Sequence, residues 1–223
     1  MRKPLKLTLL SAAVVAAAVA AGCAATSADA PAGPAPDYDA LTTQMMAASF
    51  RDEGIAKTDR LQQDAANAAC SKAQGASLPD ADAEAIQKAA LAAVKMPADG
   101  KFIGDWREGE KLAQNGRGMT WTDPAGTPAG GNCYNCHQMS KAEISFGTIG
   151  PSLYNYGKLR GVQDPADPAS APIVQYTWGK IWNAKAYSAC SEMPRFGHAK
   201  VLSEQQIQDL MALLLDPKSP VNQ

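Results

Sequence analysis

The chain has 223 residues, of which 46% are hydrophobic and 19% are charged, and its formal net charge at pH 7 is −1. This length allows one modest domain with an extension, but it is short for a large multidomain enzyme. The slightly acidic balance gives no support to nucleic-acid binding, which relies on clustered basic residues.

Residues 1–22 have the pattern of a bacterial export signal. Arg2, Lys3 and Lys6 give a positive start, and a largely apolar run extends from residue 7 to residue 21. The run is too short, and wrongly flanked, for a transmembrane span. We therefore predict an exported, periplasmic protein whose export signal is removed.

Cys23 follows the small residues Ala-Ala-Gly, as the lipid-acceptor cysteine of a bacterial lipoprotein does. The residue three positions before it is alanine rather than the more usual leucine. Cleavage after Ala30 is the alternative, and it would discard Cys23 together with any lipid anchor. Residues 23–37, rich in Ala, Pro, Ser and Gly, are expected to form a flexible tether.

Residues 38–97 are expected to form a helical extension. The stretch 39–73 is rich in Ala and Gln and lacks proline, which favours helix. A second helical stretch, 80–94, ends before Pro97, because proline cannot continue a helix. Large apolar side chains are sparse here, which indicates a thin layer packed on the main domain.

Residues 98–223 are expected to form the main domain, which opens with an amphipathic helix. Asp105 can cap this helix, and Glu108 three residues later completes a capping-box pattern. The helix is expected to end at Gly116. Gly109 lies within it and would allow a close crossing with another helix.

The chain ends with a second amphipathic helix. Ser203 and Gln206 form a capping box, apolar residues then recur at helical spacing, and Pro217 closes the element. The intervening segments are rich in Gly, Pro and Asn and leave little room for a sheet. The sequence therefore predicts an all-α fold.

The strongest chemical signal is the motif Cys133-Tyr-Asn-Cys136-His137. Two thiols at this spacing form thioether bonds to the vinyl groups of haem, and the adjacent imidazole ligates the iron. A zinc site would need four ligands, but the chain has no second Cys-x-x-Cys and His198 is its only other histidine. A thioredoxin-like redox motif would need a βαβ setting. The motif therefore predicts one covalently bound haem c.

The sixth iron ligand must come from later in the chain. Met193 precedes Pro194 shortly before the last helix, so its thioether can close the second face of the haem. Methionine ligation raises the reduction potential. His198 is the rival ligand and would give a lower-potential iron, and an ordinary core methionine is the other alternative for Met193.

The other cysteines fit an oxidising compartment. With Cys23 lipidated or removed and two thiols given to haem, Cys70 and Cys190 remain. Exported proteins commonly bridge such pairs, so we predict a disulfide between them. Two separate buried thiols are the alternative.

Several segments together resemble the SoxX family, the smaller cytochrome subunits of the SoxAX complex of bacterial sulfur oxidation, an L-cysteine S-thiosulfotransferase. The resemblance covers residues 99–222, and residues 40–97 look like the extension of longer family members. The segments are Gly131–His137, Gly150–Tyr154, Tyr156–Gly161 and Met193–His198.

The resemblance implies a class I cytochrome c fold with His137 and Met193 as axial iron ligands. In small cytochromes c a proline carbonyl commonly accepts the imidazole N–H of the ligating histidine, and Pro151 is that candidate here. The family's larger subunit, SoxA, carries the reactive cysteine that helps join thiosulfate to the SoxYZ carrier. This chain has no cysteine left to act as a catalytic thiol.

The implied role is therefore electron transfer within an enzyme complex. The SoxAX heterodimer would receive the two electrons released on the carrier and pass them to a downstream acceptor cytochrome. A stand-alone periplasmic electron shuttle is the alternative function. A haem sensor or peroxidase with an open iron site is a third, although di-haem peroxidases carry two Cys-x-x-Cys-His motifs.

Overall fold

The structure, a computed structural model, describes residues 35–223. The expected export signal, Cys23 and the first part of the expected tether lie outside these residues. The described part of the chain is helical and contains no strand, which confirms the all-α class. It divides between two compact units: helix α2 (Tyr38–Ser49) belongs to the first, and residues 50–223 form the second.

Helix does not run through the whole 39–73 stretch, so that part of the prediction is wrong between α2 and α3 (Ala65–Lys72). Gly54 has a φ of +52°, and reciprocal backbone hydrogen bonds of 2.9 Å join Glu53 and Ala56 around it. This left-handed turn interrupts the helix where glycine tolerates it. Helix α4 (Asp80–Ala92) then ends before Pro97, as predicted.

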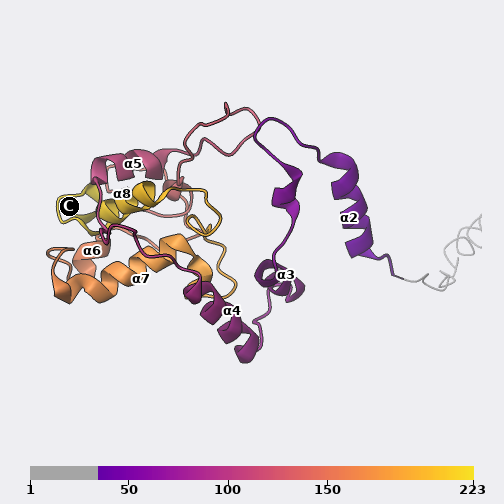
Figure 1. Cartoon of the computed structure of the whole chain (residues 1–223), viewed down its shortest axis with the longest axis horizontal. Coiled ribbons are helices and arrows are strands. Elements are labelled where there is room, and N and C mark those ends of the chain that lie inside the picture. Colours follow the sequence, from indigo (N-terminus) through magenta and orange to yellow (C-terminus); the bar gives the residue numbers. More distant parts are fainter. Residues whose placement is uncertain (1–34) are drawn as a thin grey trace, which may run out of the picture. The chain divides into compact units, whose positions relative to one another are not determined.

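The remaining elements are short helices around two longer ones, α7 (Ala171–Trp182) and α8 (Glu204–Leu215). Helix α8 contacts both α5 and α7 and lies between them (Figure 1). Its residues 207–215 are all buried, so it forms the centre of the core rather than presenting a single apolar face. The others are η1 (Thr58–Leu61), α5 (Trp106–Gln114), η2 (Cys133–Asn135), α6 (Tyr156–Leu159), η3 (Pro168–Ser170), η4 (Ala184–Ala186) and η5 (Pro220–Asn222).

The predicted starts of α5 and α8 are confirmed, and α5 ends at Gln114, two residues before the expected Gly116. The Asp105 side chain accepts a hydrogen bond from the Arg107 N–H, and Ser203 and Gln206 form the predicted capping box of α8. Glu108 does not complete a box at α5, because its carboxylate pairs with Lys111 Nζ at 2.7 Å instead.

The expected extension is packed into the second unit. Residues 50–97 belong to the same compact unit as residues 98–223, and Val94 packs against the shared core. The Lys95 carbonyl accepts a 2.8 Å hydrogen bond from Nε1 of Trp178, a fully buried side chain of α7. Phe102 packs edge-on against the same indole.

Helices α5 and α8 cross at Gly109, as its position suggested. A Cβ added at Gly109 would strike the Asp209 carbonyl and lie 3.0 Å from the Leu213 Cβ. The neighbouring Gly104 N–H donates to the Gln208 carbonyl at 2.9 Å. The two backbones therefore touch, and no side chain fits between them.

Replacing Gly109 by alanine is expected to lower the free energy of unfolding by about 2 kcal/mol. Overpacking typically costs about 1–3 kcal/mol, and the better helix propensity of alanine returns up to about 1 kcal/mol. Chemical denaturation followed by circular dichroism measures the change. Lys111→Ala, at an exposed position of the same helix, is the control and should change stability by less than about 0.5 kcal/mol. A neutral Gly109→Ala variant would contradict the close crossing.

Candidate functional site

The Cys133–His137 motif is held against the end of α5 by backbone hydrogen bonds. The Gly131 N–H donates to the Leu112 carbonyl at 2.9 Å, and the Asn132 N–H donates to the Asn115 carbonyl at 3.0 Å. Asn132 has a φ of +49°, and this left-handed residue turns the chain into η2. The motif is thus anchored to the helix that crosses α8.

Both motif thiols are outside the disulfide. Cys133 packs against the hydrophobic core, and burial raises the pKa of its thiol to about 12. A thiolate at this position would be costly, since burial penalises the charged form. A thioether carries no charge and would suit the environment.

The imidazole of His137 is fixed by the loop that follows it. Its Nδ1 lies 2.7 Å from the Pro151 carbonyl oxygen, so Nδ1 carries the proton and Nε2 keeps its lone pair. This is the contact predicted for Pro151. The Gly150 N–H donates to the Cys136 carbonyl at 2.8 Å, and a Cβ at residue 150 would strike the imidazole. Glycine is therefore required beside the ring.

A partly buried polar pair, Tyr134 and Glu110, connects the motif to α5, and sequence reasoning missed it. The Tyr134 hydroxyl donates to the Glu110 carboxylate at 3.0 Å and accepts from the Ser140 N–H at 3.3 Å. Burial raises the pKa of Glu110, although the hydrogen bonds from Tyr134 and Gln114 oppose this rise. The pair ties η2 to α5. No short-range spacing signals it, because 24 residues separate its members.

Met193 lies on a different loop from His137. The loop is tied to the end of α7, where the N–H groups of Gly197 and His198 both donate to the Trp182 carbonyl, at 3.1 and 3.0 Å. Met193 packs against the hydrophobic core, whereas His198 is exposed. The structure thus brings Cys133, Cys136, His137 and Pro151 together and holds Met193 on its own loop.

Trp182 has a buried indole nitrogen without a partner. Its Nε1 makes no hydrogen bond, in contrast to the Nε1 of Trp178 with which its ring stacks. A buried donor in this condition is uncommon in folded proteins.

Large apolar side chains stand exposed on the segment between His137 and Gly150. Ile144 is 91% exposed, Ile149 is 81% exposed and Phe146 is 37% exposed. The segment is tied to the motif, because the Gly147 N–H donates to the Tyr134 carbonyl at 2.8 Å. These side chains give the surroundings of the motif an apolar surface.

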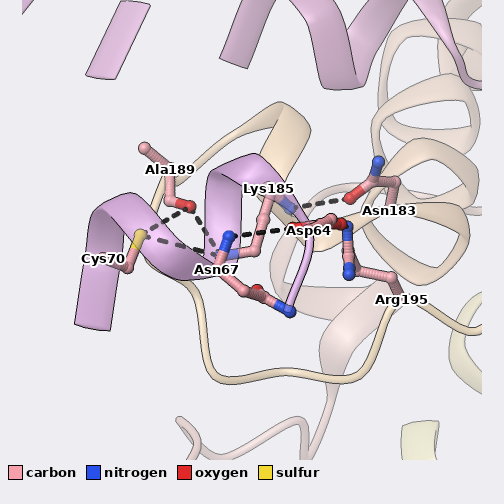
Figure 2. A network of polar contacts seen from close by, with 7 residues as sticks. All are labelled: Asp64, Asn67, Cys70, Asn183, Lys185, Ala189 and Arg195. Atoms are coloured by element: carbon pink, nitrogen blue, oxygen red, sulfur yellow. Dashed lines mark hydrogen bonds and ion pairs between the residues drawn. The ribbon is translucent and has the colours of Figure 1, made fainter. Parts of the chain in front are cut away.

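The structure contains the predicted Cys70–Cys190 disulfide, with the two Cα atoms 5.5 Å apart. It joins α3 to the loop that carries Met193. A second link runs beside it: Arg195 of that loop pairs with Asp64, the N-cap residue of α3 (Figure 2). The sequence indicated no partner for Arg195 on α3.

Within residues 35–223, no group of three or more His, Cys, Asp or Glu side chains is placed to hold a metal ion. In the same part of the chain, no helix has the length and apolarity that crossing a bilayer requires.

No family model matches the chain. A protein of Aquifex aeolicus (strain VF5), described as an uncharacterized lipoprotein, is 35% identical to it over 177 residues. The matched region covers 79% of this chain and 78% of the relative.

Proposed function

This chain belongs to the same family as the Aquifex aeolicus lipoprotein, and we propose that it is an exported single-haem c-type cytochrome. It transfers electrons as the SoxX-like subunit of a SoxAX-type complex. The relative's description as a lipoprotein supports Cys23 as the acceptor of a lipid anchor, with the folded unit on the periplasmic side of a membrane.

The observation that carries the proposal is the arrangement around His137. Two thiols free of the disulfide precede an imidazole whose Nδ1 is held by the Pro151 carbonyl at 2.7 Å. The second ring nitrogen is therefore oriented as a ligand by the hydrogen bond of the first, which is how proteins fix metal-binding histidines. Haem bound at Cys133 and Cys136 supplies a one-electron iron centre there.

The surrounding residues fit a haem. Ile144, Phe146 and Ile149 offer apolar surface to the macrocycle, and the unpaired Nε1 of Trp182 offers a donor to a propionate. Met193, on its own loop, would supply a thioether ligand to the iron. A class I cytochrome c fold is supported by the α5–α8 crossing at Gly109, which brings the helix before the motif against the last helix of the chain.

The division of labour with SoxA follows from the cysteines. Cys70 and Cys190 are joined to each other, and Cys133 and Cys136 are committed to haem. Within residues 35–223 no cysteine would then be left as a free thiol to carry a sulfur intermediate, and a His/Met iron would have no open position for thiosulfate. This chain therefore receives electrons while SoxA and the SoxYZ carrier handle the sulfur.

The test uses mature protein produced with a cytochrome c maturation system. We expect haem that survives denaturing electrophoresis. We also expect the haem to be reduced by thiosulfate only when SoxA and SoxYZ are both present, with modification of the carrier in the same mixtures.

The other outcomes separate the alternatives. Protein that matures without covalent haem would refute the cytochrome assignment. If the haem is covalently bound but its reduction does not depend on SoxA, the function is that of a stand-alone electron shuttle. Carrier conjugation catalysed by this chain alone would overturn the division of labour with SoxA.

A further inference from the structure

The Cys70–Cys190 disulfide opens onto a cavity of about 600 Å³. Both cysteines line it, together with polar side chains from α3, from η4 and from the loop after η4. Among these are Asn67, Lys185 and Ser191. The cavity is large enough for a small organic molecule and lies beside reactive sulfur.

The two sulfurs have different surroundings. Cys190 is exposed, whereas Cys70 is half-buried. Lys185 Nζ lies 3.8 Å from the Cys70 sulfur and donates to the Ala189 carbonyl at 2.9 Å (Figure 2). The same carbonyl oxygen is 3.5 Å from the Cys70 sulfur. An ammonium donor and a carbonyl acceptor therefore both face Cys70.

Lys185 is itself unusual. The residue is only 4% exposed, and no carboxylate within residues 35–223 forms a salt bridge with it. Asp64, the nearby acid on α3, pairs with Arg195. Burial lowers the pKa of Lys185, and the Arg195 charge acts in the same direction, whereas the charges of Asp64 and Glu192 oppose the shift. A negative charge formed at Cys70 would give this cation the partner that it lacks.

We infer that the Cys70–Cys190 disulfide is a thiol-exchange site for small thiols, attacked at Cys190 and leaving from Cys70. The incoming thiolate forms a new S–S bond to the Cys190 sulfur. The Cys70–Cys190 bond breaks, and its electron pair stays on Cys70 as a thiolate beside Lys185. One disulfide replaces another, so the step needs no further oxidant or reductant. A leaving thiol stabilised as thiolate speeds such exchange.

Exchange removes one of the two links between α3 and the loop 190–195. The Asp64–Arg195 pair remains as the second link, so the loop stays attached by a weaker, non-covalent contact. This inference is independent of the proposed haem function, because none of the groups in the exchange belongs to the Cys133–His137 motif.

The experiment incubates the mature protein with excess reduced glutathione near neutral pH and traps released thiols with N-ethylmaleimide. Tryptic peptides 61–72 and 186–195 report Cys70 and Cys190 separately in mass spectrometry. We expect glutathione on the Cys190 peptide and maleimide on the Cys70 peptide. Glutathione found mainly on Cys70 or equally on both, or no exchange in folded protein while unfolded protein reacts, would overturn the inference.

Lys185→Met tests the part played by the ammonium. We expect exchange to slow about tenfold, equivalent to about 1.4 kcal/mol of transition-state stabilisation. Lys180→Met is the matched control, since Lys180 is also a partly buried lysine facing a backbone carbonyl, Ala184 O at 3.4 Å, but it does not contact the disulfide. Equal rates in the two folded variants would refute the role of Lys185. Circular dichroism checks that each variant is folded, and the site of attack in the unmutated protein tests the inference without any variant.

Discussion

Protein in which Cys133 and Cys136 are both replaced by alanine is expected to lose covalently bound haem completely. The two thioether bonds can form only from these thiols, and His137 alone would hold haem by a single reversible bond. Haem staining after denaturing electrophoresis, together with the absorption spectrum of the purified protein, measures the loss. Each single replacement is expected to leave one thioether and a reduced yield of stained protein.

Cys70→Ser/Cys190→Ser is the matched control for this experiment, because it also removes two sulfurs from the chain. It should reduce stability through the loss of the bridge while leaving haem staining intact. Staining that persists in Cys133→Ala/Cys136→Ala, or that disappears only in the control, would contradict the assignment of the motif.

Replacement of Met193 by alanine is expected to have the second largest effect. The weak near-infrared band of iron–methionine bonding should vanish from the oxidised spectrum, and the reduction potential should fall sharply. Axial ligands set haem potentials over a range of about 0.8 V, and methionine favours the high end. Met193→His should restore six-coordinate iron at a lower potential, which separates loss of a ligand from loss of the fold.

Two further variants control for position. Met119→Ala changes an exposed methionine and should leave the band unchanged. His198→Ala removes the rival ligand, which is exposed, and should also leave it unchanged. If the unmutated protein lacks the band, and His198→Ala rather than Met193→Ala changes the spectrum of the six-coordinate iron, the sixth ligand is His198.

The elements with local signals were predictable. Capping residues and a helical repeat of apolar residues define α5 and α8. At position 109 glycine is the only residue type small enough for their close crossing. Helix α7 was missed, although Val174, Thr177, Trp178 and Ile181 lie buried at helical spacing. Its second residue is Pro172, and it is rich in β-branched and aromatic residues, whose intrinsic helix propensity is low. Tertiary packing around Trp178 decides its structure.

In the candidate site, too, features with a local sequence signal were predictable and contacts between distant residues were not. The Cys133–His137 motif and the Cys70–Cys190 bridge follow from residue types, their spacing and the cysteine count, and the Pro151 contact was expected from the resemblance to small cytochromes c. The pairs Tyr134–Glu110 and Asp64–Arg195 join residues far apart in sequence, and nothing in one chain alone marks such polar partners. Their partners and geometry appear only in the folded chain, where Tyr134–Glu110 is partly buried and Asp64–Arg195 lies nearer the surface.

The disulfide also constrains how the protein can mature. Its two cysteines are 120 residues apart and enclose the haem-motif cysteines, so a chain translocated N-terminus first presents Cys70, Cys133, Cys136 and Cys190 in that order. Oxidation in order of appearance would join Cys70 to Cys133 or Cys136 before Cys190 has emerged, and would consume a thiol that haem attachment needs. Such premature bridges are undone only by attack of another thiolate. For the proposed haem attachment, thiol reduction would therefore have to precede haem ligation, and the enclosing Cys70–Cys190 bridge would have to close last.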